Sequence, residues 1–325
     1  MTIYDHIKEN NVRTVLLVFA FLVLIVSLAF LSVWVVAGLI YNPDIHYSIR
    51  DLTRTIAFKY LPLVFVAGVF WLLISYFSGD EIMLSSSGAK EISRQDFPEL
   101  YSLVENTAIT AGLPVPRVFL IEDNSANAFA TGRSPAKASI AFTTGIVSLL
   151  DRSELEGVTA HEMSHIGNRD IRLMLLTVTG IGILTFLGQL MFRMTFMSSS
   201  SGGRSRKGGG RIQLIFMALG ILFLVYGFLI LPLVQYALSR NREFQADATA
   251  ALLTRNPRAL ANALAKISHD SRVESLDSLP LMSAMCIEDA SADKDGKGAG
   301  CFSMLMGLGA THPPVEERIA RLEDM

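Results

Sequence analysis

The sequence predicts a mainly α-helical integral membrane protein, in which four transmembrane helices carry one domain that contains a small β-sheet. The first observation is composition: 51% of the 325 residues are hydrophobic and only 18% are charged, which is too apolar for an ordinary soluble domain. The second is a set of four apolar runs that approach or exceed the roughly 20 residues needed to cross a bilayer as a helix. The third is a pair of polar stretches between and after these runs.

The four apolar runs define the expected transmembrane helices, at residues 14–40, 60–77, 171–192 and 212–238. The first run is about twice as long as the apolar core of a signal peptide and lacks a clear cleavage site, so we expect a retained anchor. The second run contains Pro62, but near its start, where a missing amide hydrogen costs little. Basic residues flank the spans on both sides, so charge counting does not determine the orientation.

The two polar stretches, residues 78–170 and 239–325, together have the length of about one domain. In the first stretch, residues 117–121, 127–131 and 138–143 have the pattern of short strands separated by proline and by an Asp-Asn-Ser cluster. We therefore expect a small sheet ahead of any helix that follows residue 150.

Two other segments have the composition of loops. Residues 193–211 are basic and rich in serine and glycine, which predicts a flexible connector between the last two spans, in reach of lipid head groups. Residues 287–300 are acidic and contain glycine, and they fit either a lid or an exposed insertion, of which we favour the insertion. Cys286 and Cys301 flank this segment without a Cys-x-x-Cys pattern, so reduced thiols are expected rather than a disulfide.

The segment His161-Glu162-Met163-Ser164-His165 indicates the chemistry. On a helix the two histidines lie four residues apart and face the same way, as two ligands of one zinc ion must. Zinc lowers the pKa of a bound water to roughly 7, and the carboxylate between the histidines can take that water's proton. The pattern is typical of metallopeptidases, although chance produces it in about one in a hundred chains of this length.

The helix that carries this motif has recognisable ends. Ser153 followed by Glu156 has the spacing of a capping box, which predicts that the helix begins at Ser153. Gly167 and Asn168 are typical residues of a helix end.

A two-histidine site needs a third protein ligand, and the hairpin of the last two spans indicates where it lies. The hairpin returns the chain to the membrane face that it left after the motif. Glu243 lies about five residues after the fourth run, and Asp247 shares its helical face four residues later. We therefore predict Glu243 as the third ligand, with Asp247 accepting the second imidazole proton of a ligand histidine. The alternative is a solvated charge cluster at the end of a membrane helix.

These segments resemble the HtpX-type membrane zinc endopeptidases and, more distantly, the CAAX-prenyl proteases. The resemblance covers nearly the whole chain and rests on four motifs in the same order: the His161 to His165 motif, Ser239 to Asp247, Asn127 to Gly132, and Thr311-His312-Pro313-Pro314 with Arg318. It implies a zincin-like catalytic domain with one Zn²⁺ per chain, bound by His161, His165 and Glu243, and with Glu162 as the catalytic base.

The resemblance assigns roles to the two other motifs as well. It implies that His312 and Arg318 steady the oxyanion, and that one strand pairs with the substrate backbone; its residues are Asn127, Ala128, Phe129, Ala130, Thr131 and Gly132. An exposed strand edge binds extended peptides through main-chain hydrogen bonds, which fits that role, but composition alone favours an ordinary edge strand. His312 lies at the start of an expected helix, where capping or packing explains it equally well.

The sequence thus predicts a membrane-bound zinc endopeptidase whose interfacial location suggests loops of membrane proteins as substrates, and the resemblance implies that these proteins are misfolded or damaged. By the resemblance it acts in protein quality control in a bacterial plasma (inner) membrane, with the catalytic domain on the cytoplasmic side. The net charge of −2 excludes no fold but argues against nucleic acid as a partner. Two alternatives are a catalytically silent peptide-binding scaffold in the membrane and a processing protease of narrow specificity.

Overall fold

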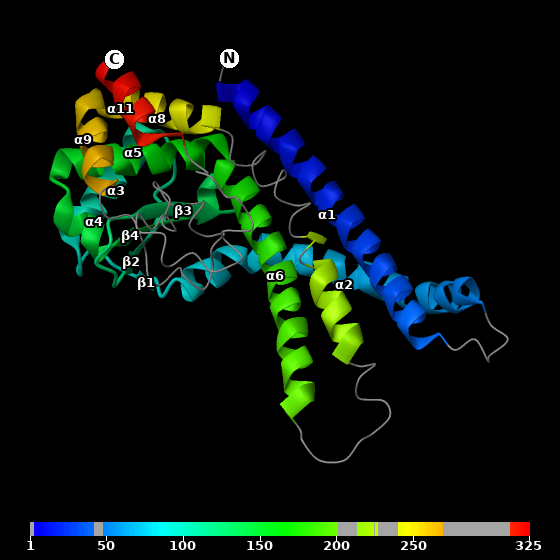
Figure 1. The fold of residues 1–325 in the computed structure, drawn as a ribbon. Helices are drawn as coiled ribbons and strands as arrows, with labels where there is room; N and C mark the ends of the chain where they lie inside the picture. The colour runs from blue at the N-terminus through cyan, green and yellow to red at the C-terminus, as the bar shows by residue number, and fades with distance from the viewer. Residues whose placement is uncertain (1–2, 42–47, 201–212, 224, 227–239, 269–312) are drawn as a thin grey trace. The chain divides into compact units, whose positions relative to one another are not determined.

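The computed structural model describes residues 3–41, 48–200, 213–223, 225–226, 240–268 and 313–325 (Figure 1). These residues form two compact units. One contains the described residues of 1–14, 75–179 and 233–325, and the other contains those of 15–74 and 180–232. The first unit holds the sheet and the described motif residues, whereas the second consists of the apolar parts of long helices.

Among the described residues, three helices are long and apolar enough to cross a membrane. They are α1 (Ile3–Ile40), α2 (Ile49–Ser86) and α6 (Asp170–Ser200). Each is longer than its apolar run, because the polar residues at the helix ends continue the same hydrogen-bonding pattern. The predicted loop 193–211 correspondingly begins as helix and is described only to Ser200, just before the first glycine pair of that segment.

The fourth expected span lies largely outside the described residues, but its first part is an apolar helix, Gln213–Phe223. This helix packs against α6 within the second unit. A Cβ atom at Gly220 would lie 3.1 Å from the ring of Phe192, and one at Gly188 would lie 3.4 Å from Phe223. Gly188 is close to Phe223 and Phe192 is close to Gly220, so the two helices are antiparallel, as in a hairpin.

The sheet of the first unit has four strands in the order β1-β2-β4-β3. The strands are β1 (Lys90–Glu91), β2 (Arg117–Ile121), β3 (Ala128–Gly132) and β4 (Ala138–Thr143). Strands β2 and β4 pair in parallel, while β1 and β3 pair antiparallel at the two edges. The predictions for 117–121 and 138–143 are confirmed, and the third strand begins one residue later than expected.

Helix α5 (Arg152–Asn168) carries the His-Glu-x-x-His motif and lies at the centre of the first unit. It contacts β3, α3 (Pro98–Thr110), α8 (Arg240–Thr254) and α9 (Pro257–Ile267), as Figure 1 shows around the green helix. Val158, Met163 and Ile166 are fully buried in the main core. Because neighbours surround α5, its polar motif is also withdrawn from water.

Smaller elements complete this unit: a turn of 3₁₀ helix, η1 (Pro135–Lys137), between β3 and β4, then α4 (Thr144–Leu149), and α11 (Val315–Glu323) against α8 and α9. Gly145 in α4 permits a close approach, because a Cβ atom there would overlap the carbonyl oxygens of Asn124 and Ser125.

The predicted start of the motif helix is wrong by two residues. Asp151 is the N-cap: its Oδ1 accepts the Ser153 and Glu154 amides at 2.8 and 2.9 Å, and the Asp151 amide donates back to Glu154 at 2.9 Å. The segment contains two overlapping capping-box patterns, Asp151 with Glu154 and Ser153 with Glu156, and the helix begins at the earlier one. Its end at Asn168 agrees with the prediction.

Candidate metal centre

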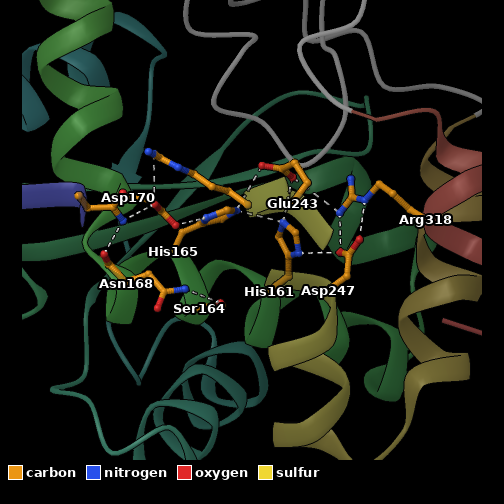
Figure 2. A network of polar contacts seen from close by, with 10 residues as sticks. His161, Ser164, His165, Asn168, Asp170, Glu243, Asp247 and Arg318 are labelled. Atoms are coloured by element: carbon orange, nitrogen blue, oxygen red, sulfur yellow. Dashed lines mark hydrogen bonds and ion pairs between the residues drawn. The ribbon is translucent and has the colours of Figure 1, made fainter. Parts of the chain in front are cut away.

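Three side chains from two helices converge in the first unit: His161 and His165 of α5 and Glu243 of α8. The two Nε2 atoms lie 3.2 Å apart, and each lies near one carboxylate oxygen of Glu243, at 3.5 Å for His161 and 3.7 Å for His165. Figure 2 shows both imidazoles turned toward the glutamate. All three residues are buried, with at most 6% of the residue exposed.

This arrangement fits a metal ion. Tetrahedral zinc with bonds of about 2.0–2.1 Å separates its ligand atoms by about 3.3 Å, close to the spacing observed here. Each histidine Nδ1 faces a carboxylate, so in the neutral rings Nδ1 carries the proton and the two Nε2 lone pairs point at one another. Such a buried set of acceptors is unfavourable unless a cation lies among them.

The charge of the surroundings agrees with a divalent cation. Among the described residues, four buried carboxylates surround the histidines, and two guanidinium groups, on Arg242 and Arg318, face these carboxylates. With neutral imidazoles the cluster therefore carries two net negative charges. The carboxylates belong to Glu162, Asp170, Glu243 and Asp247.

His161 is oriented by a chain of polar contacts. Its Nδ1 lies 2.9 Å from Asp247 Oδ1, and Arg318 donates to both oxygens of Asp247, at 2.8 and 2.7 Å. The guanidinium also lies 3.9 Å from Glu243. Arg318 is completely buried, so these carboxylates compensate its charge. Figure 2 shows Asp247 beside His161, with Arg318 next to Asp247.

His165 is oriented by a residue that the sequence reasoning missed. Its Nδ1 lies 3.1 Å from Asp170 Oδ2, and Arg242 lies 3.3 Å from the other oxygen of Asp170. Asp170 reaches this position because Arg169 ends α5 in a left-handed conformation (φ 62°) and turns the chain back before α6 begins. The signal in the sequence was a carboxylate just beyond the expected end of the motif helix.

The local electrostatics favour positive charge at the histidines. Burial lowers the pKa of His161, but its hydrogen bonds to Asp247 and Glu243 outweigh burial and raise the pKa to about 9. For His165, burial is likewise outweighed by Asp170 and Glu243, so its pKa is raised. Burial raises the pKa of Asp247, but the Arg318 guanidinium dominates and lowers it to about 2. Protons and metal ions therefore compete for the same two nitrogens.

Glu162 lies beside the histidines and is 2% exposed. Burial raises the pKa of its carboxyl group, while the neighbouring histidines and a backbone hydrogen bond from Ala130 oppose this shift. A carboxylate whose pKa is displaced toward neutrality takes up a proton more readily than an ordinary glutamate, which suits a general base.

The predicted substrate strand lies at the same site. Strand β3 is an edge of the described sheet, and the Ala130 amide contacts Glu162. The Thr143 amide donates to the Asn127 carbonyl at 3.0 Å, so the antiparallel alternation turns the main-chain groups of Ala128, Ala130 and Gly132 away from β4. All residues of β3 are buried. His312 lies outside the described residues.

Comparisons with known proteins find similar chains along nearly the whole sequence. Residues 94–325 match the family model "Peptidase family M48". A "Protease HtpX homolog" from Ligilactobacillus salivarius is 38% identical over 325 residues, covering 99% of this chain and all of that protein. One from Bacteroides fragilis (strain YCH46) is 34% identical over 317 residues, with 97% and 96% covered. Among solved structures, Ste24p of S. mikatae has a TM-score of 0.46 and 21% identity, covering 82% of this chain and 58% of that one.

The family match covers well over half of the chain, and the relatives match it almost from end to end. Both His-Glu-x-x-His histidines and Glu243 lie inside the matched region. With its candidate membrane helices, the chain belongs to peptidase family M48 and is a membrane metalloprotease.

Proposed function

We propose that the protein is a zinc-dependent endopeptidase in which His161, His165 and Glu243 bind the metal. The observation that carries this proposal is the convergence of three buried ligand atoms at spacings of 3.2–3.7 Å, with each imidazole held by a carboxylate on its other nitrogen. Three protein donors of this type leave the fourth tetrahedral position of zinc for water or substrate, as in catalytic rather than structural zinc sites.

Zinc in this site would polarise a carbonyl group and lower the pKa of a water molecule to about 7. Glu162, on the same helix, is the residue that we assign as general base. Its raised pKa favours proton uptake, and its carboxylate can then pass that proton to the leaving amine. Asp247 and Asp170 hold the two histidines with Nδ1 protonated, so that both Nε2 atoms face the metal position.

The substrate backbone is proposed to lie along β3. The main-chain groups of Ala128 and Gly132 that face away from β4 offer hydrogen bonds to an extended peptide, and the Ala130 amide, which contacts Glu162, places this edge next to the general base. Main-chain pairing gives affinity with little dependence on side chains, which suits a protease of many substrates.

Arg318 has two proposed contributions. Its contacts with Asp247 make it a support for His161, and the family resemblance gives it and His312 a role at the oxyanion. A guanidinium has five N–H donors, so it can contact more than one acceptor group at once.

We further propose that the substrates are membrane proteins, misfolded or damaged, cleaved at the cytoplasmic face of a bacterial inner membrane as part of protein quality control. The sequence supports this location, because Arg169 alone separates the motif helix from α6, a candidate span. The bacterial sources of the HtpX homologues support the compartment.

The test is cleavage by the purified protein reconstituted into liposomes, with zinc content measured by atomic absorption. The substrates are a membrane protein with a destabilised extramembrane domain, its stable parent, and casein. Faster cleavage of the destabilised protein than of its parent supports the proposal. Cleavage of neither, despite about one bound zinc, would favour the peptide-binding scaffold, and cleavage at one site of a single substrate would favour a processing protease.

A further inference from the structure

Asn10 of helix α1 makes two hydrogen bonds at the end of the motif helix, although it lies about 160 positions away in the chain. Its Nδ2 donates to the carbonyl oxygen of Asn168 and to Oδ1 of Asp170, both at 2.8 Å. Asn10 is 5% exposed and belongs to the same compact unit as its two partners. None of the site residues discussed above explains why an amide is placed there.

The orientation of the Asn10 amide follows from its partners. A carbonyl oxygen and a carboxylate oxygen are both acceptors, so only the NH₂ group of the amide can face them. The two hydrogen bonds stabilise the turn between α5 and α6. Asn168 has one of the last carbonyl groups of α5, which have no partner within the helix, and the next residue, Arg169, has a left-handed backbone conformation. Asn10 therefore fixes the position of Asp170 relative to the helix end.

Asp170 connects Asn10 to the metal centre. One of its oxygens accepts from Asn10 and lies 3.3 Å from Arg242, while the other lies 3.1 Å from Nδ1 of His165. Asp170 is 2% exposed, so bulk water does not replace a lost partner. A shift of this carboxylate releases the histidine ring that it orients.

We propose that Asn10 is a positioning residue for the metal centre: it holds Asp170, and through Asp170 it sets the orientation and tautomer of His165. The inference rests on the proposed metal ligands. With this role, the N-terminal helix α1 is part of the catalytic machinery rather than only a membrane anchor, because Asn10 contacts Asp170, which in turn contacts the proposed ligand His165.

The chain offers a matched control in the next residue. Asn11 also joins α1 to α6, but with the opposite polarity, since its Oδ1 accepts from the guanidinium of Arg172. Exchanging either asparagine for aspartate removes the NH₂ group and keeps an acceptor. Asn10→Asp loses both hydrogen bonds and brings a carboxylate against Asp170, whereas Asn11→Asp keeps its contact with Arg172.

The experiment measures metal affinity of the full-length, detergent-purified protein, by competition of a chromophoric chelator for Zn²⁺ and by the absorption spectrum of bound Co²⁺. We expect Asn10→Asp to bind Zn²⁺ about 10-fold or more weakly, in the range seen for residues behind metal ligands. Asn10→Ala should lie between it and the wild type, because it removes the donors without adding a charge. Asn11→Asp should bind as the wild type does, and the Co²⁺ spectrum should change only in the Asn10 variants.

Helical content and the midpoint of thermal unfolding are measured on every variant. Equal affinities in all variants, or equal losses at positions 10 and 11, would overturn the inference. A loss of Zn²⁺ affinity in the Asn10 variants that is fully explained by their unfolded fraction would also overturn it, because Asn10 would then only stabilise the packing of α1. The proposed ligand set is tested separately by His165→Ala: if the wild type binds no metal, or this variant binds equally well, it is the proposed function that fails.

Discussion

Asp247 is the residue whose replacement tests the polar support of the site most sharply. Asp247→Asn keeps the shape of the side chain but removes the charge that compensates Arg318, whose guanidinium makes two bonds of 2.8 and 2.7 Å to it. Arg318 is completely buried, so the substitution removes one of the two described carboxylates that compensate its charge in the interior. Among the described residues, the guanidinium then keeps Glu243, at 3.9 Å, as a neighbouring carboxylate.

The expected magnitudes follow from burial. Removing one partner of a buried ion pair typically costs about 3–5 kcal/mol, and we expect a loss of that size in the stability of the first unit. Metal affinity should fall by about 10- to 100-fold, because His161 loses its orienting carboxylate and Arg318 competes for a proposed ligand. A matched control is Glu317→Gln on α11, an exposed carboxylate 2.8 Å from Arg321, where about 0–1 kcal/mol is expected.

The second variant in this test is Asp247→Asn with Arg318→Met. If the buried guanidinium is the main cost, removing it restores part of the lost stability, so the double variant unfolds at a higher temperature than Asp247→Asn alone. The assay is thermal unfolding of metal-free protein in detergent, followed by far-ultraviolet circular dichroism. Additive losses in the double variant would refute the reasoning and would leave Arg318 with a role independent of Asp247, such as the oxyanion.

Three further predictions concern pH, packing and substrate binding. The pKa of His161 is about 9 in the folded protein and 6.5 ordinarily, so protonated His161 should stabilise the metal-free protein below pH 6.5, and this stabilisation should be lost as the pH rises toward 9. Melting curves of metal-free and zinc-loaded protein test this. A melting temperature of the metal-free protein that rises over this pH range would contradict it. Gly145→Ala should destabilise by about 1–3 kcal/mol, because its Cβ overlaps the Asn124 carbonyl, whereas Gly182→Ala, whose added Cβ meets no described atom within 4 Å, should cause no such loss. Ala130→Pro removes the β3 amide that points away from β4 and contacts Glu162, so it should reduce peptide cleavage while zinc binding persists; unchanged cleavage would argue against a role of this edge of β3 at the active site.

Short-range sequence patterns predicted two of the strands and the helical face that carries the two histidines. Short apolar runs bounded by proline and by the Asp-Asn-Ser cluster predicted β2 and β4, and the four-residue spacing of His161 and His165 predicted that both imidazoles lie on one face. The proximity of Glu243 was predictable for a different reason, since a hairpin of two spans brings its flanking segments together. The choice of helix start failed because two overlapping capping boxes compete, and sequence alone does not rank them.

The parts that were missed depend on single backbone conformations or on distant contacts. Asp170 meets His165 only because Arg169 adopts a positive φ, which is uncommon for a residue other than glycine. Strand β1 has two residues, too few for a periodic signal. Asn10 reaches the same turn from the other end of the chain, and no spacing rule connects positions so far apart.

The central claim is that Glu162 performs proton transfer beside a metal that other residues hold. Its most direct test is Glu162→Gln, purified in detergent beside the wild type and assayed for zinc per chain and for cleavage of casein, with and without chelator. The account predicts about one zinc in both proteins, chelator-sensitive cleavage by the wild type and none by the variant. Cleavage by the variant at the wild-type rate, or a wild type that cleaves without binding zinc, would contradict it.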